Sequence, residues 1–179
     1  MKKNILIVAV LLITFTLSTN AQKTANSDLK WYSWEEGYKL AKDDGKIMLV
    51  DAYTDWCHWC KVMDDKTYSQ ESVIKAIEAD FVPIKINPEK AGKYKYDGKE
   101  YSGKQLTAKL ANDKFGGYPT TFFVFPAKSE SHMEVGYLKA DVFVEKLAKY
   151  AAMQDKKGKG KTKGKTVKEK GKSKVKINK

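Results

Sequence analysis

The chain carries the sequence DAYTDWCHWCK at residues 51–61, directly after the apolar run at residues 47–50. The two cysteines of this stretch, Cys57 and Cys60, are the only cysteines in the 179 residues. The apolar run predicts a buried strand, and the cysteines would then open the helix that follows it. At a helix N-terminus the leading thiol lies against unpaired backbone N–H groups, which favour its thiolate form. The second thiol lies one turn further on, close enough to attack a mixed disulfide.

The spacing of the two cysteines also argues against other roles. A structural disulfide is the less favoured alternative, because such a short loop restricts the unfolded chain only weakly. A closed zinc site needs four ligands, and only His58 and His132 could join the two cysteines. A c-type haem requires a histidine directly after Cys60, where Lys61 stands. We therefore expect a working redox pair with no metal and no cofactor.

The N-terminus predicts export. Two lysines precede a mainly apolar stretch at residues 5–17, and the small residues Thr19 and Ala21 follow it. This pattern is typical of a secretory signal peptide, here residues 1–21. An uncleaved membrane anchor is the alternative, but the apolar stretch is shorter than the ~18 to 20 residues of a spanning helix. The mature protein is expected in the periplasm or outside the cell, where disulfides persist.

The C-terminus holds most of the positive charge. The formal net charge is +12, and residues 156–179 contain 12 lysines and one acid. A segment with so few apolar side chains cannot bury enough surface to offset its ordering entropy, so residues 155–179 are predicted to be a disordered tail. Such a tail can bind an anionic surface, or it can act only as a solubilising extension. Both alternatives stay open.

Residues 22–30 are expected to be a linker, and residues 31–154 form one domain of ordinary size. The predicted elements follow hydrophobic periodicity, capping residues and turn signals. In chain order they are a helix capped by Ser33 and ended at 44–45, a strand at 46–53, a helix from Cys57 toward Tyr68, a helix opened by Ser69 or Glu71, a strand at 81–86, an inserted loop at 87–104 with a hairpin turn at Asp97-Gly98, a helix at 106–115, a strand at 120–125, an edge strand at 133–137, and a helix from about residue 141 with Val142, Phe143, Leu147 and Tyr150 facing inward.

Strands that alternate with helices imply a three-layer α/β domain with a central mixed sheet flanked by helices. With this order, the motif WCHWC at residues 56–60 and the motif YPT at residues 118–120 resemble the thioredoxin superfamily over residues 31–153. Residues 53–63, together with the strand start FVP at 81–83, are similar to exported thioredoxin-like proteins related to the C-terminal domain of the membrane thiol:disulfide interchange protein.

The resemblance implies a role for each matching residue. Cys57 would be the exposed attacking nucleophile and Cys60 the buried resolving thiol. Asp51 falls where the family has a buried carboxylate beneath the pair, so its pKa should be raised and it could accept the proton of Cys60. Lys85 resembles the lysine that pairs with this carboxylate. The alternative for Asp51 is a solvent-facing position at the strand end.

The resemblance also implies substrate contacts. Pro119 matches the family's cis-proline, beside which the backbone of Tyr118 could pair with an extended substrate; an ordinary trans-proline is the alternative. Trp56 and Trp59 would form an apolar rim, or only pack on neighbouring loops. His58, if protonated, would stabilise the thiolate, whereas Trp59 could desolvate and destabilise it, so the redox poise stays open.

These inferences together predict an exported, monomeric thiol:disulfide oxidoreductase of thioredoxin-like fold. Its partners would be protein disulfide substrates and a membrane thiol-disulfide electron donor, with the lysine-rich tail available to an anionic surface. The alternative is a non-catalytic binding module, in which the domain is a scaffold and the tail docks to the cell envelope.

Overall fold

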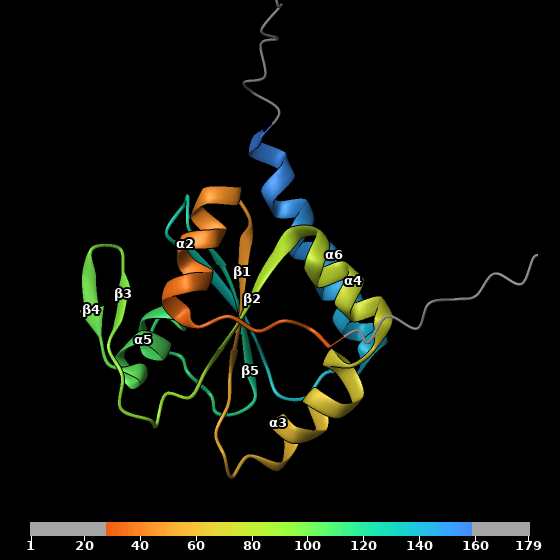
Figure 1. The fold of residues 1–179 in the computed structure, drawn as a ribbon, viewed down its shortest axis with the longest axis horizontal. Helices are drawn as coiled ribbons and strands as arrows, with labels where there is room; N and C mark the ends of the chain where they lie inside the picture. The colour runs from red at the N-terminus through yellow and green to blue at the C-terminus, as the bar shows by residue number, and fades with distance from the viewer. Residues whose placement is uncertain (1–27, 159–179) are drawn as a thin grey trace, which may run out of the picture.

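A four-stranded sheet in the order β2-β1-β5-β6 forms the centre of the computed structural model (Figure 1). The structure describes residues 28–158, so the predicted signal peptide and nearly all of the predicted tail lie outside the described residues. The strands are β1 (Ile47–Ala52), β2 (Phe81–Ile86), β5 (Thr120–Phe125) and β6 (Glu130–Val135). β1 pairs with β2 in parallel and with β5 in antiparallel orientation, and β6 is antiparallel to β5. The expected mixed sheet is therefore confirmed.

Helices cover both faces of this sheet, as Figure 1 shows. They are α2 (Trp34–Asp44) and α5 (Gly103–Leu110) on one face, and α3 (His58–Met63), the π-helix η1 (Asp64–Tyr68), α4 (Glu71–Asp80) and α6 (Ala140–Gly158) on the other. Strand side chains alternate between the two faces. In β1, Ile47 and Leu49 pack toward α4 and α6, whereas Met48 and Val50 pack toward α2 and α5. The three-layer prediction is confirmed.

Several elements follow from local signals that the sequence displays. The Ser33 side chain accepts a hydrogen bond from the backbone of Glu36, whose carboxylate accepts one in return, and Gly45 ends α2 in the left-handed region with φ of 65°. The hairpin of β3 (Tyr94–Tyr96) and β4 (Lys99–Tyr101) turns at Asp97 and Gly98, both with positive φ. These predictions are confirmed.

The inserted segment is more than a surface loop. The buried Tyr96 belongs to the same core cluster as Trp34, whose indole N–H donates to the carbonyl of Lys95 at 2.9 Å. The two rings meet edge to face with centroids 5.8 Å apart. A buried indole needs a partner for its N–H, and here the hairpin backbone supplies it. The insertion is therefore fixed to α2 by both packing and hydrogen bonding.

The predicted helix at 106–115 was misplaced at both ends. Ser102 and Gln105 form a capping box that starts α5 at Gly103, three residues before the predicted start. The helix ends at Leu110 because Asn112 and Asp113 take left-handed backbone conformations, with φ of 48° and 62°. The capping pair Ser102 and Gln105 would have predicted the correct start of α5, but the prediction followed only the spacing of apolar residues.

The edge strand and the last helix also differ in detail. β6 begins at Glu130 and ends at Val135 because Gly136, with φ of 89°, turns the chain away. The inward position of Val142 was wrong, since this side chain is 37% exposed and Val144 packs against the core instead. Phe143, Leu147 and Tyr150 are buried on α6, as expected.

The domain limits and the cysteine-bearing helix need correction too. Leu29, placed in the linker, is buried in the core, and α6 continues to Gly158, inside the predicted tail. The helix after Cys57 does reach Tyr68, but its second half is π-helical, which lets the adjacent Thr67 and Tyr68 both be buried.

None of the helices described here combines the length and apolarity that crossing a bilayer requires.

One close approach gives a stability prediction. A Cβ atom on Gly103 would lie 2.6 Å from the Cα and 2.7 Å from the carbonyl oxygen of Pro88, which are backbone atoms that cannot rotate away. Alanine would otherwise favour the helix by about 1 kcal/mol. We expect Gly103→Ala to lower the unfolding free energy by about 1–3 kcal/mol through overpacking, measured by chemical denaturation. The exposed Lys104→Ala is the control and should change it by less than about 0.5 kcal/mol; an equally stable Gly103→Ala would contradict the packing argument.

Candidate functional site

A disulfide joins Cys57 and Cys60 at the start of α3, with Cα atoms 5.3 Å apart. Cys57 is the N-cap residue of this helix, and its Sγ accepts a hydrogen bond from the backbone N–H of Cys60 at 3.1 Å. A donor of this kind stabilises negative charge on the sulfur when the pair is reduced. The geometry therefore favours a thiolate at Cys57 rather than at Cys60.

The expectation that exposure distinguishes the two cysteines was wrong. Cys57 is 4% exposed and Cys60 is 3% exposed in the disulfide form. The exposed side chains are those just before each cysteine, Trp56 at 68% and Trp59 at 55%. The difference between the two thiols therefore comes from the N-cap position of Cys57 and not from its accessibility.

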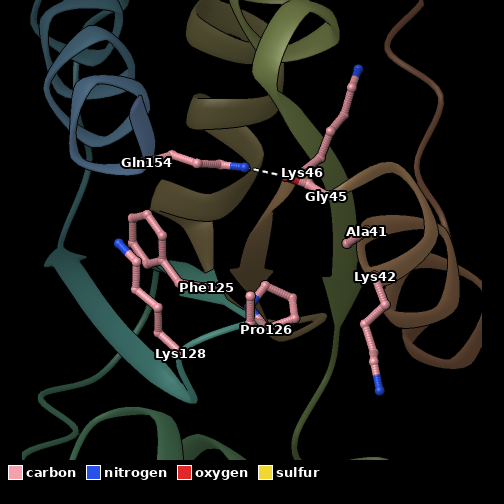
Figure 2. Close-up of a pocket in the computed structure, with 9 residues that line it drawn as sticks. Ala41, Lys42, Gly45, Lys46, Phe125, Pro126, Lys128 and Gln154 are labelled. Carbon is pink, nitrogen blue, oxygen red and sulfur yellow. Dashed lines mark hydrogen bonds between the residues drawn. The ribbon is translucent and has the colours of Figure 1, made fainter. Parts of the chain in front are cut away.

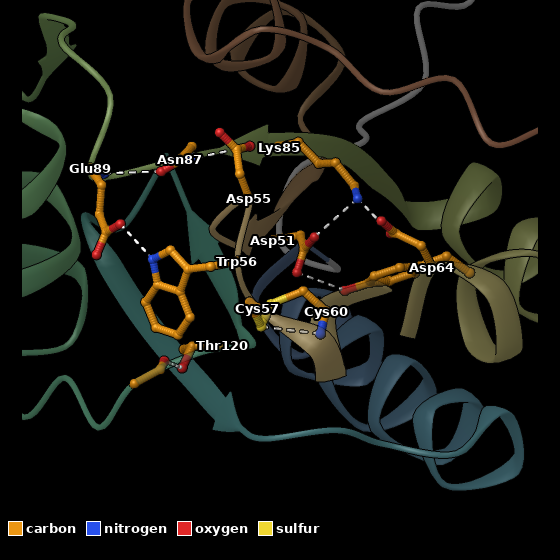
Figure 3. The surroundings of a disulfide bond; sticks show 12 residues. Asp51, Asp55, Trp56, Cys57, Cys60, Asp64, Lys85, Asn87, Glu89 and Thr120 are labelled. Carbon is orange, nitrogen blue, oxygen red and sulfur yellow. Dashed lines mark hydrogen bonds and ion pairs between the residues drawn. A yellow bond between two sulfur atoms is a disulfide. The ribbon is translucent and has the colours of Figure 1, made fainter. Parts of the chain in front are cut away.

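Asp51 lies in the middle of a polar row that crosses the sheet. Its register partners are Lys85 on β2 and Thr121 on β5. It continues the alternation of Ile47 and Leu49, so it faces the side covered by α3 and η1. The side chain is 2% exposed, which excludes a solvent-facing position. Figure 3 shows it between the disulfide and Lys85.

Three polar groups contact or support the Asp51 carboxylate. The Lys85 Nζ lies 3.4 Å from one oxygen, and the Tyr68 hydroxyl donates to the other at 3.4 Å. The same hydroxyl is 3.1 Å from the Thr121 hydroxyl. Burial raises the pKa of Asp51 to about 6, against the lowering effect of Lys85, and the nearby Asp64 raises it further. Asp51 can therefore gain or lose a proton near neutral pH.

Tyr68 stays protonated in this environment. Burial, together with the negative charge of Asp51, holds the pKa of its hydroxyl well above the usual value. A hydroxyl that keeps its proton can donate to Asp51 throughout the pH range in which that carboxylate titrates. Sequence analysis did not find Tyr68, because its approach to Asp51 depends on the π-helical turn that brings it inward.

Lys85 pairs with Asp51 as predicted, but it also has a second partner. Its Nζ lies 2.5 Å from a carboxylate oxygen of Asp64, closer than to Asp51. The ammonium group is also 4.9 Å from the ring centroid of Trp31 and 5.1 Å from that of Tyr53. Asp64 was missed, although its position four residues after Cys60 puts both on one face of the helix.

Three of the predicted substrate residues, Trp56, His58 and Trp59, flank the cysteines in the chain, and Tyr118 contacts Trp56. The peptide bond between Tyr118 and Pro119 is cis, as expected. The ring of Tyr118 meets that of Trp56 edge to face, with centroids 5.9 Å apart. Trp59 stacks on Tyr137 at 5.5 Å and contacts His58 at 5.6 Å. Both tryptophans are thus packed against a neighbouring loop and still largely exposed, which combines the two alternatives left open by the sequence.

A separate cavity of about 130 Å³ lies at the other end of the sheet, between α2, the end of β5 and α6 (Figure 2). Its lining includes Lys46 and Lys128, but their amines are engaged elsewhere. Lys46 donates to the carbonyl of Glu78 at 2.8 Å, and Lys128 donates to that of Met153 at 3.2 Å. Lys46 precedes β1, whereas the disulfide follows it, so this cavity is not part of the redox site.

A family model named Thioredox_DsbH and described as "Protein of unknown function, DUF255" matches residues 13–172. The chain belongs to this family. Over 103 residues, 57% of this chain, it is 28% identical to the Uncharacterized protein B0495.5 of Caenorhabditis elegans and covers 13% of that protein. The matched part is therefore a small fraction of this longer relative.

Solved structures show the fold of this DUF255 chain. A thioredoxin from Thermus thermophilus superposes with a TM-score of 0.57 and 22% identity, covering 74% of this chain and 95% of the thioredoxin. A structure titled "DsbH Oxidoreductase" gives a TM-score of 0.54 with 18% identity, covering 80% of this chain and 99% of the other. The resemblance to the thioredoxin superfamily is confirmed.

The raised pKa of Asp51 gives a pH-dependent stability prediction for this DUF255 chain. The folded state holds a proton that the unfolded chain loses at its pKa of 3.8, so stability falls as pH rises toward about 6. We expect Asp51→Asn to unfold like the wild type at pH 4 and to be more stable at pH 8 by an amount on the order of 2–3 kcal/mol. Denaturation of the oxidised proteins measures this.

The control for Asp51→Asn is Asp43→Asn, which removes an exposed carboxylate from α2. This variant should follow the wild type within about 0.5 kcal/mol at both pH values. If Asp51→Asn gives no additional stability at pH 8, the carboxylate is fully compensated by Lys85 and cannot serve as a proton acceptor near neutral pH.

Proposed function

We propose that this chain is a thiol:disulfide oxidoreductase that reduces or exchanges protein disulfides through Cys57 and Cys60. The observation that carries the proposal is the pairing of these cysteines at a helix N-terminus next to a buried carboxylate with a pKa of about 6. A structural disulfide requires no such carboxylate. An exchange reaction gains from such a group, because the resolving thiol must lose its proton before it attacks and a nearby carboxylate can accept it.

The reaction begins with the reduced protein. The Cys57 thiolate attacks one sulfur of the client disulfide, and the other client sulfur leaves as a thiolate that takes a proton. Cys60 then gives its proton to Asp51 and attacks the Cys57 sulfur of the mixed disulfide. The second client sulfur leaves, and the Cys57–Cys60 disulfide forms. Two electrons pass from the protein to the client, and an external dithiol donor must return them.

The setting of this reaction follows from the family resemblance and the N-terminal pattern. We propose that the protein is exported, acts as a monomer on extracytoplasmic protein disulfides, and receives electrons from a membrane thiol-disulfide donor. The lysine-rich tail would hold it near an anionic envelope surface. The reducing direction rests on the family resemblance, whose members receive electrons from membrane partners. The N–H donor to Cys57 Sγ stabilises the reduced thiolate and, by itself, shifts the pair toward the oxidising direction.

Separate cysteine variants test the assignment of attack and resolution. Cys60→Ser should accumulate a mixed disulfide through Cys57 with a protein disulfide such as that of insulin, because the resolving thiol is missing. Cys57→Ser should react at least about tenfold more slowly, since its remaining thiol lacks the N-cap position. Mass spectrometry under non-reducing conditions measures the adduct. Equal adduct formation by both variants would contradict the assigned roles.

The equilibrium reduction potential of the Cys57–Cys60 pair tests whether the protein reduces client disulfides or forms them. Mixtures of reduced and oxidised dithiothreitol or glutathione should place the Cys57–Cys60 pair near ~ −270 mV, the range of thioredoxin and of a reductase. A value near ~ −120 mV would instead make the protein a disulfide-forming oxidant. Cys57→Ser, which cannot form the pair, gives the baseline for the assay. A pair that does not cycle at all would overturn the oxidoreductase proposal.

A further inference from the structure

Glu89 lies in a turn that the fold holds firmly beside the redox site. In the segment Asn87-Pro88-Glu89-Lys90, the backbone N–H of Lys90 donates to the carbonyl of Asn87, and that of Glu89 donates to the Asn87 side chain, both at 3.1 Å. Gly103 at the start of α5 packs directly on the backbone of Pro88. The turn is therefore held by hydrogen bonds within it and by the packing of α5 against its backbone.

Asp55 ties this turn to the loop that carries the cysteines. Its carboxylate accepts from the Asn87 amide at 3.4 Å and pairs with the Lys90 ammonium at 3.1 Å. Lys90 thus compensates the charge of Asp55. Among residues 28–154, no lysine or histidine nitrogen lies within 4.0 Å of the Glu89 carboxylate. Glu89 is therefore an exposed carboxylate with no ion-pair partner within that range.

That carboxylate contacts Trp56, the residue before Cys57, and the ring of Trp56 contacts Tyr118. One carboxylate oxygen of Glu89 accepts a hydrogen bond from the indole N–H of Trp56 at 2.8 Å, as Figure 3 shows. Trp56 in turn meets Tyr118 edge to face. Burial raises the pKa of Tyr118, and the negative charge of Glu89 raises it further, so the carboxylate lies within electrostatic reach of this phenol as well.

A carboxylate beside two partly exposed aromatic rings suits a cation. An ammonium or guanidinium group can pair with the carboxylate and lie against the ring faces. An acidic side chain at the same place would be repelled by Glu89, and an apolar one would leave that charge unpaired. The position of the rings next to Cys57 puts such a cation close to the reacting sulfur of the client.

We propose that Glu89, Trp56 and Tyr118 form a subsite for a basic side chain of the client, adjacent to the cysteine that Cys57 attacks. This inference rests on the proposed function and names a class of client for it, namely disulfides flanked by lysine or arginine. Trp56 and Tyr118 supply the contact surface, and Glu89 supplies the selectivity. The exchange reaction itself is unchanged.

Single-turnover kinetics with matched peptides test the subsite. Three peptides each hold one cysteine in a disulfide with 2-mercaptoethanol and differ only in having lysine, glutamine or glutamate beside that cysteine. Each peptide is mixed with excess pre-reduced protein, so no external donor is needed. We expect the rates to fall from lysine through glutamine to glutamate, with lysine ahead of glutamate about threefold to tenfold at low ionic strength. Added salt should reduce this ratio.

Glu89→Gln is the decisive variant, because its amide oxygen can still accept the indole hydrogen bond while the charge is removed. We expect its lysine-to-glutamate rate ratio to approach one. Glu145→Gln removes the same charge from the exposed side of α6 and should keep the wild-type ratio. Because the readout is a ratio within each protein, a change in the fraction of active protein does not alter it.

The outcomes separate the two proposals. If the wild type reacts with all three peptides at equal rates, or if Glu89→Gln keeps the full preference, the subsite is overturned and the oxidoreductase proposal stands. If the wild type reacts with none of the peptides, including the uncharged one, the oxidoreductase proposal fails and the subsite fails with it.

Discussion

The burial of Asp51 in the central strand is the constraint on which the rest of the site depends. β1 has neighbours on both sides, so a polar side chain at its end can be satisfied only by adjacent strands and covering helices. The strand register places Lys85 of β2 on one side of Asp51 and Thr121 of β5 on the other. The π-helical turn after the cysteines then brings the Tyr68 hydroxyl over the same carboxylate. Each partner comes from a different element, so the site exists only in the complete fold.

Burial raises the pKa of Asp51 more than Lys85 lowers it, and Lys85 is shared between Asp51 and Asp64. The Lys85 ammonium lies closer to Asp64, at 2.5 Å, than to Asp51, at 3.4 Å, and Asp64 is the more exposed of the two carboxylates. A fully paired Asp51 would stay ionised at every physiological pH, and an isolated one would stay neutral. Partial compensation leaves its pKa at about 6. That intermediate value is what a group needs if it must take a proton from a thiol and later release it.

The sequence predicted correctly those features that depend only on residues close together in the chain. The capping box at Ser33, the hairpin turn at Asp97 and the cysteine motif are each written in a few consecutive residues. Asp51 and Lys85 were found because a known family places charges there. Tyr68 and Glu89 could not be found in this way, because their partners lie 17 and 33 residues away and meet them only through a helical irregularity or an insertion.

The contrast between local patterns and long-range contacts also bears on where the proposed selectivity for clients would arise. Asp51 lies on β1 and the two cysteines lie at the start of α3, whereas Glu89 lies at the start of the segment that joins β2 to α5. That segment is held by the Trp34 hydrogen bond to Lys95 and by the packing of Gly103 on Pro88. A contact group on so well-supported a turn loses little entropy when a client binds. In the proposed reaction this segment would select clients without changing the exchange chemistry, because it is hydrogen-bonded to the loop before the cysteines and not to the cysteines themselves.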